Sequence, residues 1–517
     1  MLPPYQPEPF TNFADPAHAQ AMQAALAHVH AQLGQPYPLI INGERVETEQ
    51  HDPSHNPARP AQVIGAMASA TPEHAAQALD AATVAFQSWR RVPAAERANY
   101  LFRAAAHIRR QKFEWAAWLV YEVSKSWAEA DGDVAETIDF LEYYGREMLR
   151  LAAPQPGVAY PGESNEFRYI PLGVCAVIPP WNFPLAIMAG MTVAAIVAGN
   201  TVVLKPAHTS AVVAARFVAL LNDECHLPPG VLNFVPGPGG VIGDALVDSP
   251  KTRIIAFTGS KEIGLRIFNR ASVRQPGQNW LKRTILEMGG KDAIVVDETA
   301  DLELAADAIT ASAFGFQGQK CSACSRAIIV ESVYDELLRR VVERSRKLTV
   351  GDPADPQNTL GAVIDHKAFE KIGGYLALAP NEGRVVLGGE VGAAEDGYFI
   401  PPTIVADVAP DARVACEEIF GPVVAFIKAR DFAHATEIFN STEYGLTGGL
   451  ISRDRQRLEQ ARAEFHVGNL YLNRKITGAL VGVQPFGGFN MSGTDSKAGG
   501  PDYLTLFMQG QSITERY

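Results

Sequence analysis

The sequence predicts an α/β protein built on parallel, doubly wound sheets, and three observations support this fold class. Short apolar runs alternate with helical stretches from Gly173 onward, a pattern typical of βαβ units whose strands are covered on both faces. A similar series starts again near Asp292. The chain has 517 residues, whereas one hydrophobic core stops growing at about 250–300 residues. We therefore expect two major domains.

The composition is that of an ordinary globular chain and excludes several classes of function. Hydrophobic residues make up 47% and charged residues 20% of the sequence. A net charge of −12 argues against nucleic-acid and anionic-membrane partners, which repel an acidic surface. The longest apolar run, 184–198, is shorter than the roughly 20 residues that span a bilayer, and the N-terminus lacks a basic or Arg-rich targeting segment. We expect a cytoplasmic location.

The N-terminal part is predicted to be mostly helical. A Pro-rich arm leads to a helix over about 17–33, and the Asn-Gly turn after the apolar run 39–41 predicts a hairpin. Thr71-Pro72-Glu73 predicts a helix start, because it supplies an N-cap, a proline at the first helical position and an early acid. A long helical region is expected over about 94–150.

Five strands and four helices are expected in the first α/β series. The strands are predicted at 174–178, 201–204, 231–235, 253–257 and 284–287, and the helices at about 185–198, 208–222, 240–248 and 261–271. In open parallel sheets the ligand binds beyond the carboxyl ends of the strands. Glycine, proline and polar residues gather at those ends, namely at 180–182, 205–207, 237–239, 258–260 and 287–290.

The second series has four predicted strands and four predicted helices. The strands are expected at 293–296, 327–330, 385–387 and 423–427, and the helices at about 303–313, 333–347, 432–440 and 454–464. The tail, 504–517, has strand-like apolar content and is expected to add an edge strand to a neighbouring subunit.

Several strand ends of the first series suit a nucleotide. Gly237-x-Gly239-x-x-x-Gly243 follows a strand and opens a helix, although its third glycine falls one residue later than in the dinucleotide fingerprint, and a plain turn explains it equally well. Thr258-Gly259-Ser260 would offer N–H groups and hydroxyls to a pyrophosphate at a helix N-terminus. Lys205 closes a strand and is either a ribose or phosphate contact or an ordinary surface lysine.

Cys321, on the Gly- and Gln-rich loop that starts at Gly315, is the candidate nucleophile. Thiolate is the reactive form, and a cation such as the neighbouring Lys320 lowers a thiol pKa. The loop alone leaves a buried packing cysteine as an equal alternative. Cys321-x-x-Cys324 also suits a redox pair, whereas no metal is expected because no second Cys/His cluster has ligand spacing. The odd count of five cysteines is typical of a reducing compartment.

Two further residues complete a reaction scheme. Glu287 ends an apolar strand, so its carboxyl would have a raised pKa suited to a general base, the alternative being a salt-bridged edge residue. The amide of Asn182 can stabilise a developing oxyanion. Together these groups suggest thiohemiacetal chemistry, in which sulfur attacks a carbonyl, hydride leaves to a nicotinamide and the carboxylate activates water.

Seven motifs in order along most of the chain resemble those of the NAD(P)-dependent aldehyde dehydrogenase superfamily. They are Pro180–Pro184, Lys205–Ala207, Phe257–Ser260, Leu286–Lys291, Gly318–Cys321, Glu418–Pro422 and Pro485–Gly488. The resemblance implies Cys321 as nucleophile, Glu287 as general base, and Asn182 with the Cys321 N–H as oxyanion hole. It implies NAD as cofactor, with contacts from Ile178, Pro179, Pro180, Trp181, Lys205, Ala207, His208, Gly239, Gly243, Phe257, Thr258, Gly259, Ser260, Ile263, Glu418 and Phe420.

The resemblance also implies three modules and an aldehyde dehydrogenase-like fold. The cofactor-binding domain is expected over 1–154 and 169–289, with a return segment near 471–490, and the catalytic domain over 290–470. A small strand-exchanging oligomerisation element is expected from 155–168 and 491–517, which implies a homo-oligomer.

Within that superfamily, Gly315–Ala323 and Asn473–Gly482 look most like the 1-pyrroline-5-carboxylate dehydrogenase branch, which oxidises L-glutamate γ-semialdehyde to L-glutamate in proline breakdown. A substrate with an α-carboxylate needs donors at the far end of the pocket, and two successive backbone N–H groups can form an anion nest. The expected substrate contacts are Glu136, Phe183, Lys320, Ser322, Gly478, Ala479 and Phe486. Functional coupling to a proline dehydrogenase goes with this branch.

Two residues depart from the family pattern. His208 stands where relatives often carry a carboxylate that repels a 2′-phosphate, so NADP is expected as a weaker substitute for NAD. Cys324 stands where relatives commonly have a small non-thiol residue, and it either pairs oxidatively with Cys321 or packs quietly.

Two other functions compete with this reading. One is a dehydrogenase for another small aldehyde, and the other is a catalytically silent binding protein on the same fold. The presence of Cys321, Glu287 and Asn182 together speaks against a silent protein.

Overall fold

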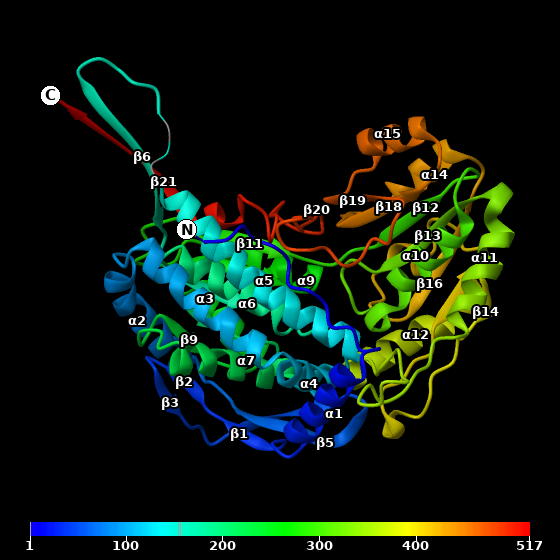
Figure 1. Cartoon of the computed structure of the whole chain (residues 1–517), viewed down its shortest axis with the longest axis horizontal. Helices are drawn as coiled ribbons and strands as arrows, with labels where there is room; N and C mark the ends of the chain where they lie inside the picture. The colour runs from blue at the N-terminus through cyan, green and yellow to red at the C-terminus, as the bar shows by residue number, and fades with distance from the viewer. Residues whose placement is uncertain (1, 154, 156) are drawn as a thin grey trace.

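The computed structural model describes residues 2–153, 155 and 157–517 and places two α/β domains side by side, with a two-stranded ribbon projecting from the first (Figure 1). Residues 1, 154 and 156, which fall within the expected domain limits, lie outside the described residues. No helix within the described ranges is long and apolar enough to cross a membrane.

The first domain is built on a seven-stranded sheet in the order β11-β10-β7-β8-β9-β2-β3. Its five parallel strands confirm the first predicted series, and they are β7 (Val174–Ile178), β8 (Thr201–Leu204), β9 (Leu232–Phe234), β10 (Thr252–Thr258) and β11 (Arg283–Glu287). The predicted hairpin, β2 (Leu39–Ile41) and β3 (Glu44–Val46), extends the sheet in antiparallel direction. Asn42 and Gly43 both have positive φ in its turn, as a tight hairpin requires.

Helices cover both faces of this sheet because its strands are apolar on both sides. The covering helices include α2 (Pro72–Trp89), α6 (Ala186–Val197), α7 (Ala211–Ala219) and α9 (Lys261–Ala271). Thr71 caps α2 as predicted, with its hydroxyl accepting from the His74 N–H. The expected helices over 208–222 and 240–248 are partly irregular, since short turns η1 (His208–Ser210), η2 (Leu220–Glu224) and η3 (Gly239–Gly243) flank α7 and α8 (Asp244–Asp248).

The long helical region is divided into three helices. They are α3 (Ala94–Arg110), α4 (Lys112–Val123) and α5 (Trp127–Ala152). The first break falls at Gln111, and the second follows Ser124, which adopts the left-handed conformation with φ 58°. α5 packs on α3, α4 and α6, so it lies within the helical layer of the first domain.

The second domain carries another seven-stranded sheet, in the order β14-β15-β16-β13-β12-β18-β19. Four of its strands were predicted, namely β12 (Asp292–Val296), β13 (Cys324–Val330), β14 (Arg384–Leu387) and β16 (Val423–Ala429). Strands β15 (Thr403–Ala406), β18 (Thr447–Ile451) and β19 (Asn469–Leu472) complete it, and only the edge strand β14 runs antiparallel.

Helices of the second domain match the prediction, with one long and one short addition. α10 (Leu302–Phe314), α11 (Glu331–Ser345), α14 (Phe432–Phe439) and α15 (Arg455–Glu464) were expected, and α12 (His366–Glu382) was not. A four-residue helix, α13 (Arg413–Cys416), precedes the segment that carries Glu418. After β19 the chain returns to the first domain, where Gly493 pairs with Glu287 and the Met288 N–H donates to Ser492.

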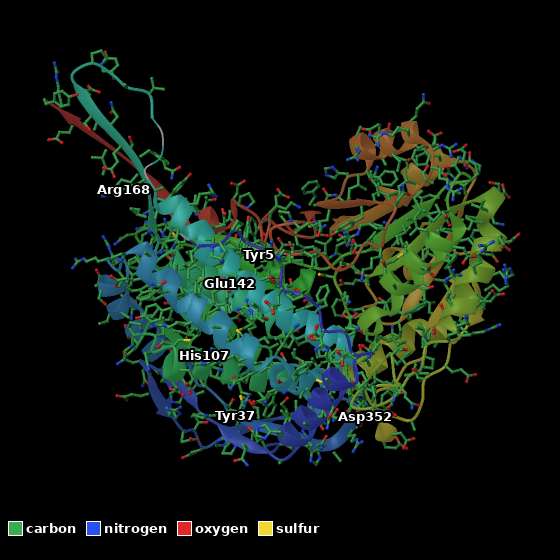
Figure 2. All side chains as sticks on the ribbon, viewed as in Figure 1. Tyr5, Tyr37, His107, Glu142, Arg168 and Asp352 are labelled. Atoms are coloured by element: carbon green, nitrogen blue, oxygen red, sulfur yellow. The ribbon has the colours of Figure 1, made fainter. Side chains whose placement is uncertain are left out.

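The N-terminal arm runs along α5 toward α1 (Pro16–His30), and Tyr5 lies beside Glu142 of α5 (Figure 2). Its backbone is tied to that helix, because the N–H groups of Glu8 and Thr11 donate to Asp139 and Asp131 at 2.7 and 2.8 Å. A three-stranded sheet of β1 (Gln35–Tyr37), β4 (His51–Asn56) and β5 (Arg59–Ala68) follows α1 and the turn after it.

The predicted tail strand is β21 (Met508–Arg516), and it pairs antiparallel with β6 (Glu163–Pro171) of the same chain to form the projecting ribbon (Figure 1). A second small pair, β17 (Tyr444–Gly445) with β20 (Phe489–Asn490), lies near the return segment.

Candidate active site

The loop between α10 and β13 carries Cys321 and is held in an unusual backbone conformation. Phe316, Gln317 and Gly318 adopt the left-handed region in succession, with φ values of 50°, 56° and 66°. Such strain persists only where the surroundings impose it and is common at functional sites. A Cβ on Gly318 would lie 2.3 Å from the Gly421 carbonyl, so this position requires glycine. The loop leaves Cys321 half-buried.

Asn182, just after β7, supports this loop from the first domain. Its side-chain Nδ2 donates to the Gln319 carbonyl at 3.0 Å, two residues before Cys321. The Gln319 side chain in turn accepts from the Ile364 N–H at 2.9 Å. An amide carries two N–H donors, so the second remains for a substrate oxygen.

The Cys321 thiol has an acidic environment. Burial raises its pKa well above the ordinary value, and the carboxyl groups of Asp292, Glu418 and Glu287 raise it further. Lys320 instead forms an ion pair with Glu129 of α5, at 2.7 Å to each carboxylate oxygen. The expectation that Lys320 lowers the thiol pKa is therefore wrong for this structure, because Glu129 neutralises that cation.

Glu287, the last residue of β11, has the raised pKa expected of it. Burial raises the pKa of its carboxyl to about 8. Oε2 accepts from the Gly488 N–H at 3.3 Å, and Oε1 accepts from the Ser496 hydroxyl. A Cβ on Gly487 would lie 2.8 Å from Oε1, so the glycines of the return segment make room for this carboxyl.

Glu418 faces the same region from the segment before β16. Its Oε1 accepts from the Gly290 N–H at 3.0 Å, and a Cβ on Gly289 would lie 2.4 Å from each carboxylate oxygen. The two glycines after Glu287 therefore admit Glu418. Phe420, with φ 61°, packs edge-to-face on Trp181 at 5.5 Å between ring centroids, which brings the two domains together here.

The residues predicted to hold NAD fit a dinucleotide. The Lys205 side chain is 6% exposed, its Nζ donates to the Pro206 carbonyl at 3.0 Å, and no carboxylate of the described residues forms a salt bridge with it. Burial lowers the pKa of Lys205 to about 8, because its ammonium is desolvated. Oxygen atoms of a bound ligand would stabilise the charged form. A Cβ on Gly239 or Gly243 would meet nothing within 4 Å, which leaves room for a ligand beside them. Ser260 caps α9 through the Ile263 N–H.

The other predicted cofactor residues lie at the same edge of the first sheet. They follow three neighbouring strands: Ile178, Pro179 and Pro180 after β7, Ala207 and His208 after β8, and Phe257, Thr258 and Gly259 at the end of β10. His208 is exposed at the start of η1. Because these strands are adjacent and parallel, the predicted contacts share one crevice edge.

The predicted substrate end carries more charge than the sequence indicated. Besides Lys320 and Glu129, it holds the buried pair Lys125 and Asp133, whose ion-pair distance is 2.8 Å. The Lys125 ammonium lies 3.9 Å from the centroid of Phe183. None of Lys125, Glu129 and Asp133 was predicted, since their partners come from other parts of the chain or lie across a helix break, and no motif marks them.

Of the remaining predicted substrate residues, Glu136 and Gly478 lie near charged groups of this region. Burial raises the pKa of Glu136 to about 8, with Asp133 adding to the rise and Lys125 opposing it. Gly478 has φ 76°, and its Cβ position lies 3.6 Å from the Lys475 Nζ. The structure describes Ser322 as buried after the nucleophile, Ala479 beside Gly478, and Phe486 paired through its backbone with Ala498.

Cys324 begins β13 inside the core of the second domain. Its Sγ lies 3.4 Å from the Arg326 carbonyl, and burial raises its pKa to about 12. All five cysteines are free. This environment favours the packing role over oxidative pairing. The described residues contain no cluster of three or more His, Cys, Asp or Glu that could hold a metal ion.

Comparison with known proteins identifies the family. Residues 45–513 match the model of the "Aldehyde dehydrogenase family". The chain belongs to the aldehyde dehydrogenase family. The seven motifs and the two-domain fold are thereby explained, and the aldehyde dehydrogenase-like fold class predicted from the sequence is confirmed.

Individual relatives of this aldehyde dehydrogenase cover its whole length. The chain is 61% identical over 517 residues to a 1-pyrroline-5-carboxylate dehydrogenase of Geobacillus thermodenitrificans (strain NG80-2), with 100% of both chains covered. It superposes with a TM-score of 0.98, at 50% identity and full coverage of both chains, on a 1-pyrroline-5-carboxylate dehydrogenase from Thermus with bound NAD. It also resembles proline utilization A from Bdellovibrio bacteriovorus, with a TM-score of 0.97 and 46% identity, covering 99% of this chain and 53% of that one.

Proposed function

We propose that this aldehyde dehydrogenase oxidises L-glutamate γ-semialdehyde, the open form of 1-pyrroline-5-carboxylate, to L-glutamate. The observation that carries this proposal is the charged cluster beyond the nucleophile loop. Lys320 and Glu129 form an ion pair there, with Lys475 and Glu136 nearby, so the region beside the Cys321 loop holds groups of both signs. An α-amino acid end of a substrate carries both signs as well. The full-length similarity to 1-pyrroline-5-carboxylate dehydrogenases supports the same substrate.

The chain's own residues supply the covalent step. Glu287 or a water takes the proton of the Cys321 thiol, and the sulfur attacks the aldehyde carbon. The free N–H of Asn182 with the Cys321 N–H stabilises the oxyanion of the thiohemiacetal. NAD, when bound, accepts the hydride that leaves this carbon with its electron pair. Glu287 then takes a proton from a water that attacks the thioester, the C–S bond breaks, and the carboxylic acid leaves while the thiolate is restored.

NAD is the proposed cofactor and NADP a weaker substitute. Lys205, Gly239, Gly243, Ser260 and Glu418 would hold it along the crevice edge. A relative with bound NAD supports the general choice. The exposed imidazole of His208 presents no carboxylate to a 2′-phosphate, which supports some use of NADP.

The proposal also includes assembly into a homo-oligomer and functional coupling to a second enzyme. The projecting ribbon of β6 and β21 supports a homo-oligomer. The expected three-module division stays a proposal, and within it the segment 491–507 packs against the end of β11 and not in the ribbon. The similarity to proline utilization A supports functional coupling to a proline dehydrogenase.

A substrate panel tests the proposed reaction. NADH formation is followed with 1-pyrroline-5-carboxylate, propanal, succinic semialdehyde and betaine aldehyde, and kcat/KM is compared. We expect the first substrate to exceed the other three by at least about tenfold, because only it satisfies charges of both signs in the cluster. A higher kcat/KM with any of the other three would overturn the substrate assignment.

A further inference from the structure

The carboxyl of Glu287 is held almost entirely by one distant segment of the chain. Ser496, 209 residues further on, donates its hydroxyl to Oε1, and the Gly488 N–H donates to Oε2 at 3.3 Å. That segment is fixed against the end of β11, since the Met288 N–H donates to the Ser492 carbonyl at 2.7 Å and the Thr494 N–H donates to the Leu286 carbonyl at 2.9 Å. The hydroxyl of Ser496 is therefore delivered by a rigid backbone.

Lys497 adds a fixed positive charge beside the same carboxyl. Its Nζ donates to the Gly468 carbonyl at 2.8 Å and to the Gly487 carbonyl, which anchors the half-buried ammonium. Three other charged or titratable groups face Glu287. They are Asp495 on the same segment as Lys497, the Cys321 thiol of the nucleophile loop, and Tyr503 of η6 (Tyr503–Phe507), a short turn that follows Lys497 in the chain. Lys497 is the one cation in this set of described residues.

We infer that Ser496 and Lys497 are positioning residues that orient Glu287 and favour its ionised form for its role as general base. This inference deepens the proposed function and rests on Glu287 acting in that step. A carboxylate is an acceptor only, so a hydroxyl donor and a nearby cation both favour its charged form. Burial at the end of the apolar strand β11 disfavours the charged form, because the carboxylate loses water. Ser496 and Lys497 offset part of this cost.

The expected consequence concerns pH. A general base works only when ionised, so hydrolysis of the thioester falls as pH drops through the pKa of Glu287. Removing the Ser496 hydroxyl raises this pKa, because the charged carboxylate loses a donor. The acid limb of the rate then moves to higher pH, and a shift of about one pH unit makes the rate about tenfold lower on that limb. At pH well above the limb the rate returns toward that of the unmodified enzyme.

The experiment compares pH profiles of kcat for the full-length enzyme and matched variants. Any aldehyde that the enzyme oxidises serves as substrate, and a pre-steady-state NADH burst shows that thioester hydrolysis limits turnover. Ser496→Ala should shift the acid limb upward by about one unit, and Ser496→Thr, which keeps the hydroxyl, should restore it. Thr494→Val is the control, since that hydroxyl contacts Leu286 and not Glu287.

Lys497 is tested in parallel. Lys497→Met should shift the limb in the same direction, and Lys497→Arg, which keeps the charge, should shift it less. If Ser496→Ala does not fold, these two Lys497 variants still test the positioning role. Equal loss of kcat at every pH, with no movement of the limb in either series, would show a merely structural role and overturn the inference.

Glu287→Gln separates this inference from the proposed function. If this variant removes the acid limb while Ser496→Ala and Lys497→Met leave it in place, only the positioning role fails. If the acid limb survives Glu287→Gln unchanged, Glu287 is not the titrating base, and both the proposed mechanism and the inference fall.

Discussion

At the scale of single residues, burial is the main cause of the pKa shifts of the Cys321 thiol and of the three carboxyl groups that face it. The pKa of the thiol is raised, and so are those of Glu287, Glu418 and Asp292, in each case mainly because the charged form is desolvated. For the thiol this direction favours the protonated form, so a base must take its proton before the sulfur attacks a carbonyl. The carboxyls that face it differ mainly in their partners: Gly290 holds Glu418, whereas Ser496 and Gly488 hold Glu287.

A substitution at His208 tests the basis of cofactor choice. In His208→Glu a carboxylate would stand beside the adenosine ribose, where it repels a 2′-phosphate. We expect the ratio of kcat/KM with NAD to that with NADP to rise by about tenfold or more. His28→Glu, at an exposed histidine on α1, is the matched control for adding a surface charge. An unchanged ratio in His208→Glu would show that this position does not discriminate.

Sequence reasoning reached some site residues and missed others for a physical reason. Cys321, Glu287 and Asn182 follow recognisable loops or strand ends, so their types and places could be predicted. Ser496 and Lys497 belong to no periodic pattern, and only the fold brings them to Glu287. The ion pair of Lys320 was missed on the same ground, because its partner Glu129 lies 191 residues earlier in the chain; its predicted substrate contact stays a prediction.

At the scale of elements, strands made of continuous apolar residues could be predicted, whereas a strand that contains glycine was missed. β7 and β8 occur with the predicted bounds, since their residues are buried on both faces. β18 was missed because Gly448 and Gly449 have low strand propensity. Both are required there, as a Cβ on Gly448 would lie 2.2 Å from the Phe439 ring and one on Gly449 2.8 Å from Ile476. α12 was missed because two glycines and Pro380 lie within it.

The ribbon of β6 and β21 allows a test of the proposed assembly. It projects from the first domain and exposes Phe167 at 40% relative accessibility, an arrangement that favours pairing with a second copy (Figure 1). Truncation after Met508 removes β21 and should convert the proposed oligomer to a smaller species in light scattering coupled to gel filtration. Phe167→Ser should weaken association less. A truncated chain of unchanged mass per particle would contradict the assignment of the ribbon to assembly.

At the scale of the whole molecule, the site exists only where the two domains and the return segment meet. Asn182 and Glu287 come from the first domain, Cys321 and Glu418 from the second, and the segment after β19 closes against both. The N-terminal arm adds a further tie, because the Tyr5 hydroxyl donates to the Val481 carbonyl at 3.0 Å, close in sequence to Gly478 and Ala479, the expected substrate contacts. The family match begins at residue 45, and the similarity to the 1-pyrroline-5-carboxylate dehydrogenase of Geobacillus thermodenitrificans extends over the arm as well. The two-sheet fold could be predicted because each strand has a local sequence pattern. The packing around Glu287 could not, because it joins residues that are far apart in the sequence.

The central claim is that a covalent thioester forms on Cys321 and that Glu287 releases it. The most direct measurement is mass spectrometry of the Glu287→Gln enzyme quenched after mixing with NAD and 1-pyrroline-5-carboxylate. We predict a glutamyl adduct on the peptide that contains Cys321, formed with the NADH burst and absent from Cys321→Ala, which should still bind NAD. A full burst of NADH without an adduct, or an adduct on another residue, would contradict the account.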